Sequence, residues 1–148
     1  MFRLLFILSV LSVVLATQAF ASNGTDSLLD QSYQQSQSGK LDEALATLQK
    51  AVKQDPSSST VHMRLGGVRV LRREYDAGIK DFQKAIMLDG KNASAFVGLA
   101  VAYLHQGKYG LARAALDEAG RIDESKKDQI AKVQAWIEQR TQGKGSVH

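Results

Sequence analysis

The sequence predicts an all-α fold, a solenoid of helical hairpins. The chain matches itself when it is shifted by about 34 residues, and a fixed period of this length is typical of stacked supersecondary units. It also has one proline in 148 residues, and apolar residues make up 44% of it, enough to bury a core. The frequent Ala, Leu, Gln and Lys favour helices, because these side chains lose little rotamer freedom there.

The period is visible as columns of similar residues, and every column repeats at this same spacing. The columns are Ala51, Ala85 and Ala119; Asp55, Asp89 and Asp123; Ala44, Gly78 and Ala112; Leu48, Phe82 and Leu116; and Leu41, Tyr75 and Tyr109. They predict three units, at about 25–58, 59–92 and 93–126. Gly39, Arg73 and Gly107 stand at the same turn of successive units.

Each unit is expected to be a helix, a turn and a second helix. In the third unit Phe96, Leu99, Ala100 and Tyr103 recur at i, i+3, i+4 and i+7, which places them on one helix face. Gly107 is expected to end this helix, because glycine readily takes the left-handed conformation found there. The second helix is then expected to face the core with Leu111, Ala112, Ala115, Leu116 and Ala119.

A further helix is expected over about 127–141, where it would cap the last unit. Ile130, Val133 and Ile137 form its apolar stripe, and Trp136 lies near the edge of that stripe. Residues 142–148 are glycine-rich, and we expect them to be a disordered tail.

The N-terminal residues predict a secretory signal peptide over 1–21. Arg3 is followed by an apolar run over 4–16, and Ala19-Phe20-Ala21 places small residues where a signal peptidase cuts. Residues 22–27 then predict a linker. The chain is therefore expected to be exported, and to be periplasmic or secreted. The alternative is an uncleaved segment that anchors the chain in the membrane.

The helical units resemble tetratricopeptide repeats, whose pattern is W-x2-L-G-x2-Y followed by A-x3-F and P. The second unit gives His62-x2-Leu65-Gly66-x2-Arg69 and then Gly78-x3-Phe82, and the third gives Phe96-x2-Leu99-Ala100-x2-Tyr103 and then Ala112-x3-Leu116. The first unit matches mainly through Ala44-x3-Leu48 and Pro56. The resemblance implies a right-handed helical-hairpin solenoid of three tetratricopeptide repeats, a solvating final helix and a concave groove lined by the first helix of each unit.

By that resemblance, a partner-binding groove would be formed by a second face of the first helices. Its residues would be Leu29, Tyr33, Met63, Gly67, Val70, Val97, Val101 and Leu104. The alternative is that several of these residues pack against neighbouring repeats, since apolar stripes usually belong to a core. Some family members hold a peptide carboxylate with Lys and Asn, but the matching positions here are mostly apolar, so a chaperone-tail ligand is disfavoured.

Arg69 stands where the family usually has an aromatic core residue. It could meet an anionic ligand. We expect instead that its stem packs and that its charged head reaches solvent or a carboxylate such as Glu74.

Other classes of function have little support in the sequence. The absence of cysteine excludes disulfides and thiolate metal sites, and His62, His105 and His148 lack metal-ligand spacing. No catalytic motif or phosphate-binding loop is present, so we expect no enzyme, no catalytic residues, no metal and no cofactor. The formal charge of +4 is mixed in sign along the chain, which argues against nucleic acid.

These observations predict a non-enzymatic protein-protein interaction module or assembly adaptor of the cell envelope. It would bind a peptide or helix of a partner protein in the apolar concave groove. The alternative is a structural protein that forms homo-oligomers. Membrane contact is expected only if the N-terminal segment is not cleaved.

Overall fold

The computed structural model describes residues 24–142, and they are helices joined by short turns. They fall into two compact units, one ending at Pro56 and the other beginning at Ser57, which we describe separately. The predicted signal peptide at 1–21 and the tail residues 143–148 lie outside the described part. Within the described part no helix combines the length and the apolar character that a membrane span needs.

The first unit is a hairpin of a helix over residues 24–37 and α2 (Leu41–Gln54). The predicted linker is wrong over residues 24–27, which are helical. Thr25 is buried there, and its hydroxyl lies 3.5 Å from Oε1 of Gln54 on α2. The start of this helix therefore packs on α2 through Thr25.

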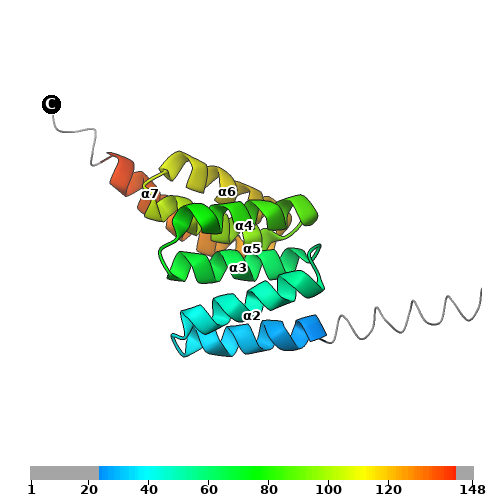
Figure 1. The fold of residues 1–148 in the computed structure, drawn as a ribbon. Coiled ribbons are helices and arrows are strands. Elements are labelled where there is room, and N and C mark those ends of the chain that lie inside the picture. The colour runs from blue at the N-terminus through cyan, green and yellow to red at the C-terminus, as the bar shows by residue number, and fades with distance from the viewer. Residues whose placement is uncertain (1–23, 143–148) are drawn as a thin grey trace, which may run out of the picture. The chain divides into compact units, whose positions relative to one another are not determined.

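The second unit contains α3 (Ser59–Leu71), α4 (Tyr75–Leu88), α5 (Ala93–His105) and α6 (Tyr109–Ile122). A short 3-10 helix, η1 (Glu124–Lys126), leads into α7 (Lys127–Gln142). α3 packs on α4, and α5 packs on both α4 and α6 (Figure 1). The prediction of an all-helical solenoid of helical hairpins is confirmed.

The helix boundaries repeat with the period of the sequence. α2, α4 and α6 begin at Leu41, Tyr75 and Tyr109, which form one of the sequence columns. α3, α5 and α7 begin at Ser59, Ala93 and Lys127, which are separated by the same repeat period. α7 therefore stands in the register of the first helix of a further hairpin.

The core of the second unit is built from small residues and a few large ones. Ala85, Ala112 and Ala119 have no exposed surface, and Phe82 and Leu116 are 3% exposed. Small side chains let the helix backbones approach closely, so a larger residue in these columns would overpack the core. Leu111 is 51% exposed, so the prediction that it faces the core is wrong: it lies at the edge of the α6 stripe.

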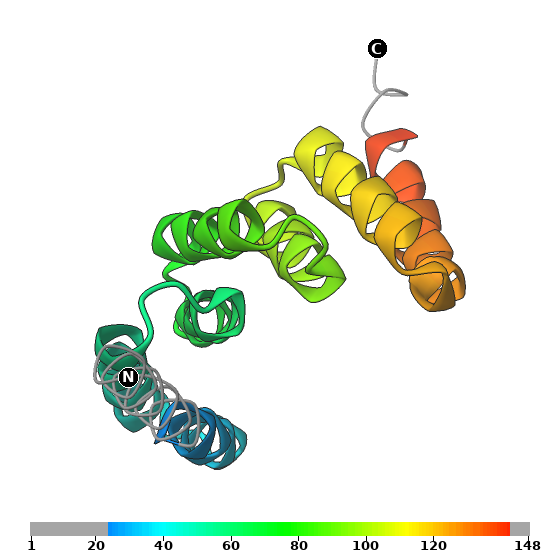
Figure 2. The same cartoon turned by 90° about the vertical axis from the view of Figure 1, so that its right-hand side faces the viewer.

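α7 closes the end of this core. Ile130 and Ile137 are buried in it, and Val133 packs against it. α7 contacts α6 and η1 and lies beside α6 (Figure 2). Gln142, which the sequence assigns to the tail, is the last residue of α7.

Candidate interaction groove

One face of α5 carries a continuous line of small and apolar residues. Ser94, Val97, Val101 and Leu104 follow one another at helical spacing, which aligns them on this face. Val97 and Leu104 are partly buried and pack against the core, whereas Val101 is 38% exposed. A hollow lies at each end of the line. We call this face together with its two hollows the α5 groove.

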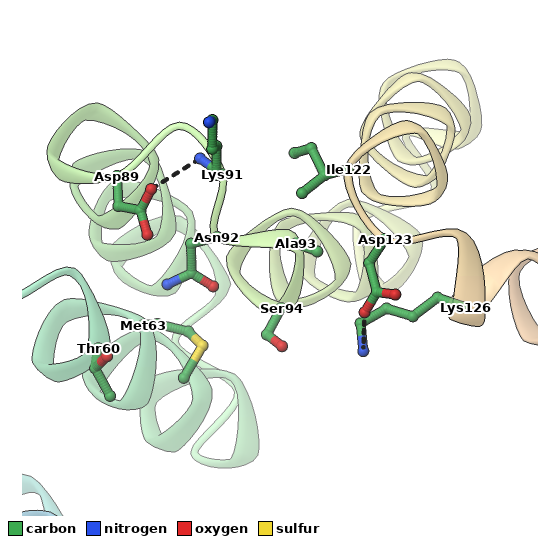
Figure 3. A pocket seen from close by; sticks show the side chains of 10 residues that line it. All are labelled: Thr60, Met63, Asp89, Lys91, Asn92, Ala93, Ser94, Ile122, Asp123 and Lys126. Atoms are coloured by element: carbon green, nitrogen blue, oxygen red, sulfur yellow. Dashed lines mark hydrogen bonds and ion pairs between the residues drawn. The ribbon is translucent and has the colours of Figure 1, made fainter.

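The first hollow, the α3–α5 hollow, has a volume of about 480 Å³. In Figure 3, Thr60 and Met63 of α3 stand on one side, Asp123 and Lys126 stand on the other, and Ser94 of α5 lies between them. The turn between α4 and α5 completes the lining with Asp89, Lys91 and Asn92, together with Ala93 and Ile122.

The polar groups of the α3–α5 hollow hold helix ends. The side chain of Asn92 accepts a hydrogen bond from the backbone N–H of Ala95 and donates one to Oγ of Ser59, at 3.0 and 2.8 Å. Oδ1 of Asp123 accepts a hydrogen bond from the Ser125 hydroxyl, which lowers the pKa of that carboxyl. These groups fix the start of α5 and of η1, and Oδ2 of Asp123 also pairs with Nζ of Lys126 at 3.1 Å.

The second hollow, the α5–α7 hollow, has a volume of about 650 Å³ and a different character. Its lining is Val101, Leu104, His105, Gln106, Gly107, Tyr109, Trp136 and Arg140. Trp136 is 41% exposed. Tyr109 meets its ring edge-on with centroids 6.4 Å apart, and the Arg140 guanidinium lies 4.5 Å from its centroid. The hollow therefore combines aromatic rings with one cationic side chain, that of Arg140, beside the apolar line of α5.

The structure separates the predicted groove residues into three groups. Met63, Val70, Val97 and Leu104 are partly buried and contact the core. Val70 packs inward in particular, because a Cβ built at Gly78 would lie 3.0 Å from its Cγ2. The alternative that some of these residues serve packing therefore describes Val70 well.

Gly67 and Val101 are the open members of the predicted set. A Cβ built at Gly67 meets no atom within 4 Å. Gly67 follows Met63 by one helical turn, so it continues the face of α3 that carries Thr60 and Met63 into the α3–α5 hollow. Leu29 is partly buried and Tyr33 is 45% exposed, and both belong to the first unit, whereas the α5 groove is formed by residues of the second.

The predicted groove lacks the aromatic and cationic part of the α5–α7 hollow, which is formed by Tyr109, Trp136 and Arg140. The sequence places Trp136 at the edge of the α7 stripe, but its contact with Tyr109 depends on how α7 packs on α6. The available signal was the spacing of Trp136 and Arg140, which are one helical turn apart on α7.

Arg69 is held inside the α3–α4 hairpin. Its Nη1 lies 3.0 Å from Oδ2 of Asp81, and the two side chains are 26% and 13% exposed. Glu74 pairs instead with Arg72, Oε1 to Nε, at 2.6 Å. Arg69 therefore finds a carboxylate as the sequence suggests, but the partner is Asp81 and not Glu74.

The histidines serve separate local contacts. The ring of His105 stacks on that of Tyr75, with centroids 4.8 Å apart, and His62 lies near Asp81. His148 lies outside residues 24–142. Across those residues no group of three or more potential ligands is placed to hold a metal ion.

Models of known protein families match the sequence of these helices. Two models described as tetratricopeptide repeat match residues 29–90 and 69–137, and together they cover most of the chain. The chain belongs to the tetratricopeptide repeat family. The overlapping matches span both compact units and extend into α7, so the repeat assignment covers the α5 groove.

The curated relatives are much longer proteins. The peroxisomal targeting signal receptor of Komagataella phaffii is 34% identical over 78 residues, which are 53% of this chain. That stretch is 14% of the receptor's length.

Two solved structures illustrate the similarity in fold. The Yersinia enterocolitica type III secretion chaperone SycD in complex with a peptide of the translocator YopD has a TM-score of 0.72 and 20% identity, covering 78% of this chain and 93% of that one. The second tetratricopeptide repeat domain of human RPAP3 in complex with an HSP70 peptide has a TM-score of 0.72 and 19% identity, covering 80% and 98%.

Proposed function

We propose that this chain is a non-catalytic interaction module that binds an apolar peptide segment or helix of a partner protein along the α5 groove. The observation that carries the proposal is the line from Ser94 to Leu104, which runs between two hollows and leaves Val101 38% exposed where it enters the α5–α7 hollow. Such a face suits a partner that places apolar side chains at regular intervals. SycD and RPAP3, which share the fold, were solved with bound peptides, and this supports the proposal.

Gly67 offers a test that spares the core. A tryptophan at this position has room to project from α3 toward the groove, since no atom lies within 4 Å of its Cβ. Random peptides displayed on phage are selected against the purified protein and then tested on the variants. We expect Gly67→Trp to weaken their binding by about tenfold or more, equivalent to about 1.4 kcal/mol.

Gly110 provides the matched control. It lies on α6, outside both hollows, and a Cβ there also meets nothing within 4 Å. Gly110→Trp should therefore bind the selected peptides as well as the wild type does. Equal binding by both variants would place the interaction outside the α5 groove, and a failure to enrich any peptide would contradict the proposed function.

We also propose that the module acts in the cell envelope. The support is the sequence of residues 1–21, with Arg3, the apolar run and the Ala19-Phe20-Ala21 site. Export should yield a chain that begins at Ser22, which the intact mass of the protein from the envelope fraction measures. Full-length chain in the membrane fraction would instead support the uncleaved anchor.

The second candidate function is a structural one, in which copies of the chain pair with each other. Leu71, Met87 and Leu111 are 60%, 79% and 51% exposed, and each offers apolar surface to another copy. SycD was also solved as an alternative dimer, at a TM-score of 0.74 and 21% identity over 80% of this chain and 95% of that one. Sedimentation of the purified protein separates the candidates, because only self-association raises the mass without a partner.

A further inference from the structure

The α5–α7 hollow exists because α7 begins where the repeat period places the first helix of a further hairpin, but does not pack on α5 as α5 packs on α3. α7 begins one repeat period after α5, as α5 does after α3. α3 and α5 approach each other closely, whereas α5 and α7 make no close backbone contact and α7 packs on α6 and η1. The side chains between α5 and α7 are therefore left as the walls of a hollow.

The walls of the hollow are apolar and aromatic, and the aromatic side chain of Trp136 is in contact with its neighbours. Val101 and Leu104 form one side and Trp136 the other. The Trp136 ring contacts both the Tyr109 ring, at an interplanar angle of 68°, and the guanidinium of Arg140. A volume of about 650 Å³ accommodates a large side chain of a partner together with its backbone.

Arg140 is the charged residue of the lining, which contains no acidic residue. One carboxylate adjoins the lining: Asp76 of α4 accepts a hydrogen bond from Nε2 of the lining residue Gln106 at 2.8 Å. The nearest carboxylate along α7 is Glu138, which pairs with Arg113 at 3.4 Å. Among residues 24–142 no ion pair is found for Arg140, whose observed contact is the face of Trp136. A carboxylate at this rim would gain a charge-assisted hydrogen bond.

We propose that the α5–α7 hollow binds a peptide segment in which a large apolar or aromatic side chain is followed directly by an acidic one. The apolar side chain enters between Leu104 and Trp136, and the carboxylate meets Arg140. This rests on the proposed function and adds the chemistry of the partner. The chain's own tail fits less well, because residues 143–148 contain Lys144 and His148 and no acidic side chain.

Trp136 is the one tryptophan of the chain, so its fluorescence reports on this hollow directly. The probe is an acetylated and amidated peptide, Gly-Ser-Leu-Phe-Asp-Glu-Ser-Gly, titrated into the full chain at low salt. Its two counterparts carry Lys-Lys in place of Asp-Glu, or Ser-Ser in place of Leu-Phe. We expect the acidic peptide to shift Trp136 emission and to bind about tenfold or more tightly than either counterpart.

A charge reversal at Arg140 tests the assignment of the carboxylate. Arg140→Glu should reverse the preference, so that the Lys-Lys peptide binds more tightly than the Asp-Glu peptide. Lys132→Glu is the matched control, because Lys132 is exposed on the same helix and does not line the hollow. It makes the same change in net charge and should leave the preference for the acidic peptide intact.

Other outcomes would overturn the inference in distinguishable ways. If the Asp-Glu and Lys-Lys peptides bind equally, or if Arg140→Glu and Lys132→Glu change the preference equally, an acidic residue in the partner is excluded. The proposed binding along the α5 groove is then not contradicted. If no peptide shifts the emission although phage-selected peptides remain sensitive to Gly67→Trp, the hollow is not part of the binding surface. An emission change on deletion of 143–148, or on raising the protein concentration, would identify the occupant as the tail or a second copy.

Discussion

At the scale of single residues, the Arg69–Asp81 pair shows how this repeat departs from its neighbour. One period later, Tyr103 and Ala115 stand at the same positions of the third unit. Where that unit has an aromatic ring and a methyl group, the second unit has a largely buried ion pair. Burial raises the pKa of Asp81, although the nearby Arg69 and His62 act to lower it.

Transplanting the residues of the third unit tests this account. Asp81→Ala leaves the guanidinium of Arg69 without its carboxylate, and we expect a loss of about 2 kcal/mol of unfolding free energy. Arg69→Tyr together with Asp81→Ala should recover most of that loss, because the pair is then replaced by apolar packing. Urea unfolding of the three proteins measures this, and a double variant no more stable than Asp81→Ala would contradict it.

The Arg69–Asp81 pair also predicts that the stability of the protein depends on pH. Because the folded state holds the Asp81 proton to higher pH than the unfolded chain does, the contribution of Asp81 to stability is greatest at low pH. It is lost as pH rises from the ordinary aspartate pKa through the raised one. The stability of the wild type relative to the double variant, Arg69→Tyr with Asp81→Ala, should therefore fall over that window, and a constant difference would argue against the raised pKa.

Arg73 shows a second departure at a single position. It has φ of 65°, as Gly39 and Gly107 have 74° and 68° at the equivalent turns, and a side chain in this region costs about 1–2 kcal/mol. Arg73→Gly should raise the unfolding free energy by about 1 kcal/mol, because glycine takes this conformation freely. Gly107→Ala should lower it by a similar amount, because open space surrounds that glycine and only the backbone is affected. Thermal melting of both variants provides the measurement, and shifts in the same direction would contradict the backbone cost.

At the scale of elements, one ring joins three helices. Phe82 of α4 is 3% exposed, and its ring lies against Gly66 of α3 and Gly98 of α5. A Cβ built at Gly66 would lie 3.0 Å from the ring, and one at Gly98 would lie 2.3 Å from it. The absence of side chains at these two glycines is therefore what lets α3 and α5 close on the Phe82 ring.

Gly98→Ala should destabilise the protein by about 1–3 kcal/mol, because its methyl group overlaps a buried ring. Combining it with Phe82→Leu should cost less than the sum of the single changes, since the smaller side chain makes room. Gly67→Ala is the control: it makes the same substitution in open space, where alanine should stabilise the helix by about 0.5–1 kcal/mol. Additive effects of Gly98→Ala and Phe82→Leu in calorimetry would rule out the shared contact.

At the scale of the whole molecule, the sequence predicts the helical hairpins well, whereas it does not separate packed from open residues in the candidate groove. The helix starts follow columns such as Leu41, Tyr75 and Tyr109, and local patterns suffice to find these. Helical spacing could not separate Val70, which packs on Gly78, from Val101, which is open, because both faces of the first helices are apolar. The contact of Trp136 with Tyr109 joins two helices and has no local signal.

The apolar core is also distributed unevenly along the chain. The main cluster runs from Ile79 through Phe82 and Leu116 to Ile137, all within the second unit. Among its described residues, the first unit buries one large apolar side chain, Leu48, together with Ala44 and Ala51 and the polar residues Thr25, Ser32 and Thr47. In repeat proteins each hairpin contributes its own stability and that of its nearest interfaces, so opening is expected to be local.

Amide hydrogen exchange should therefore be slowest in α5 and α6 and much faster over residues 24–54. Burial of one fully enclosed Leu contributes about 1.5–3 kcal/mol, which is little against the entropy of ordering a hairpin. The first unit should then open without the second, in a process that does not expose the Phe82 core. Ala85→Leu supplies the control, because it should accelerate exchange in α4 to α6 while leaving residues 24–54 almost unchanged. Equal protection in α2 and α5 would show instead that both units unfold as one.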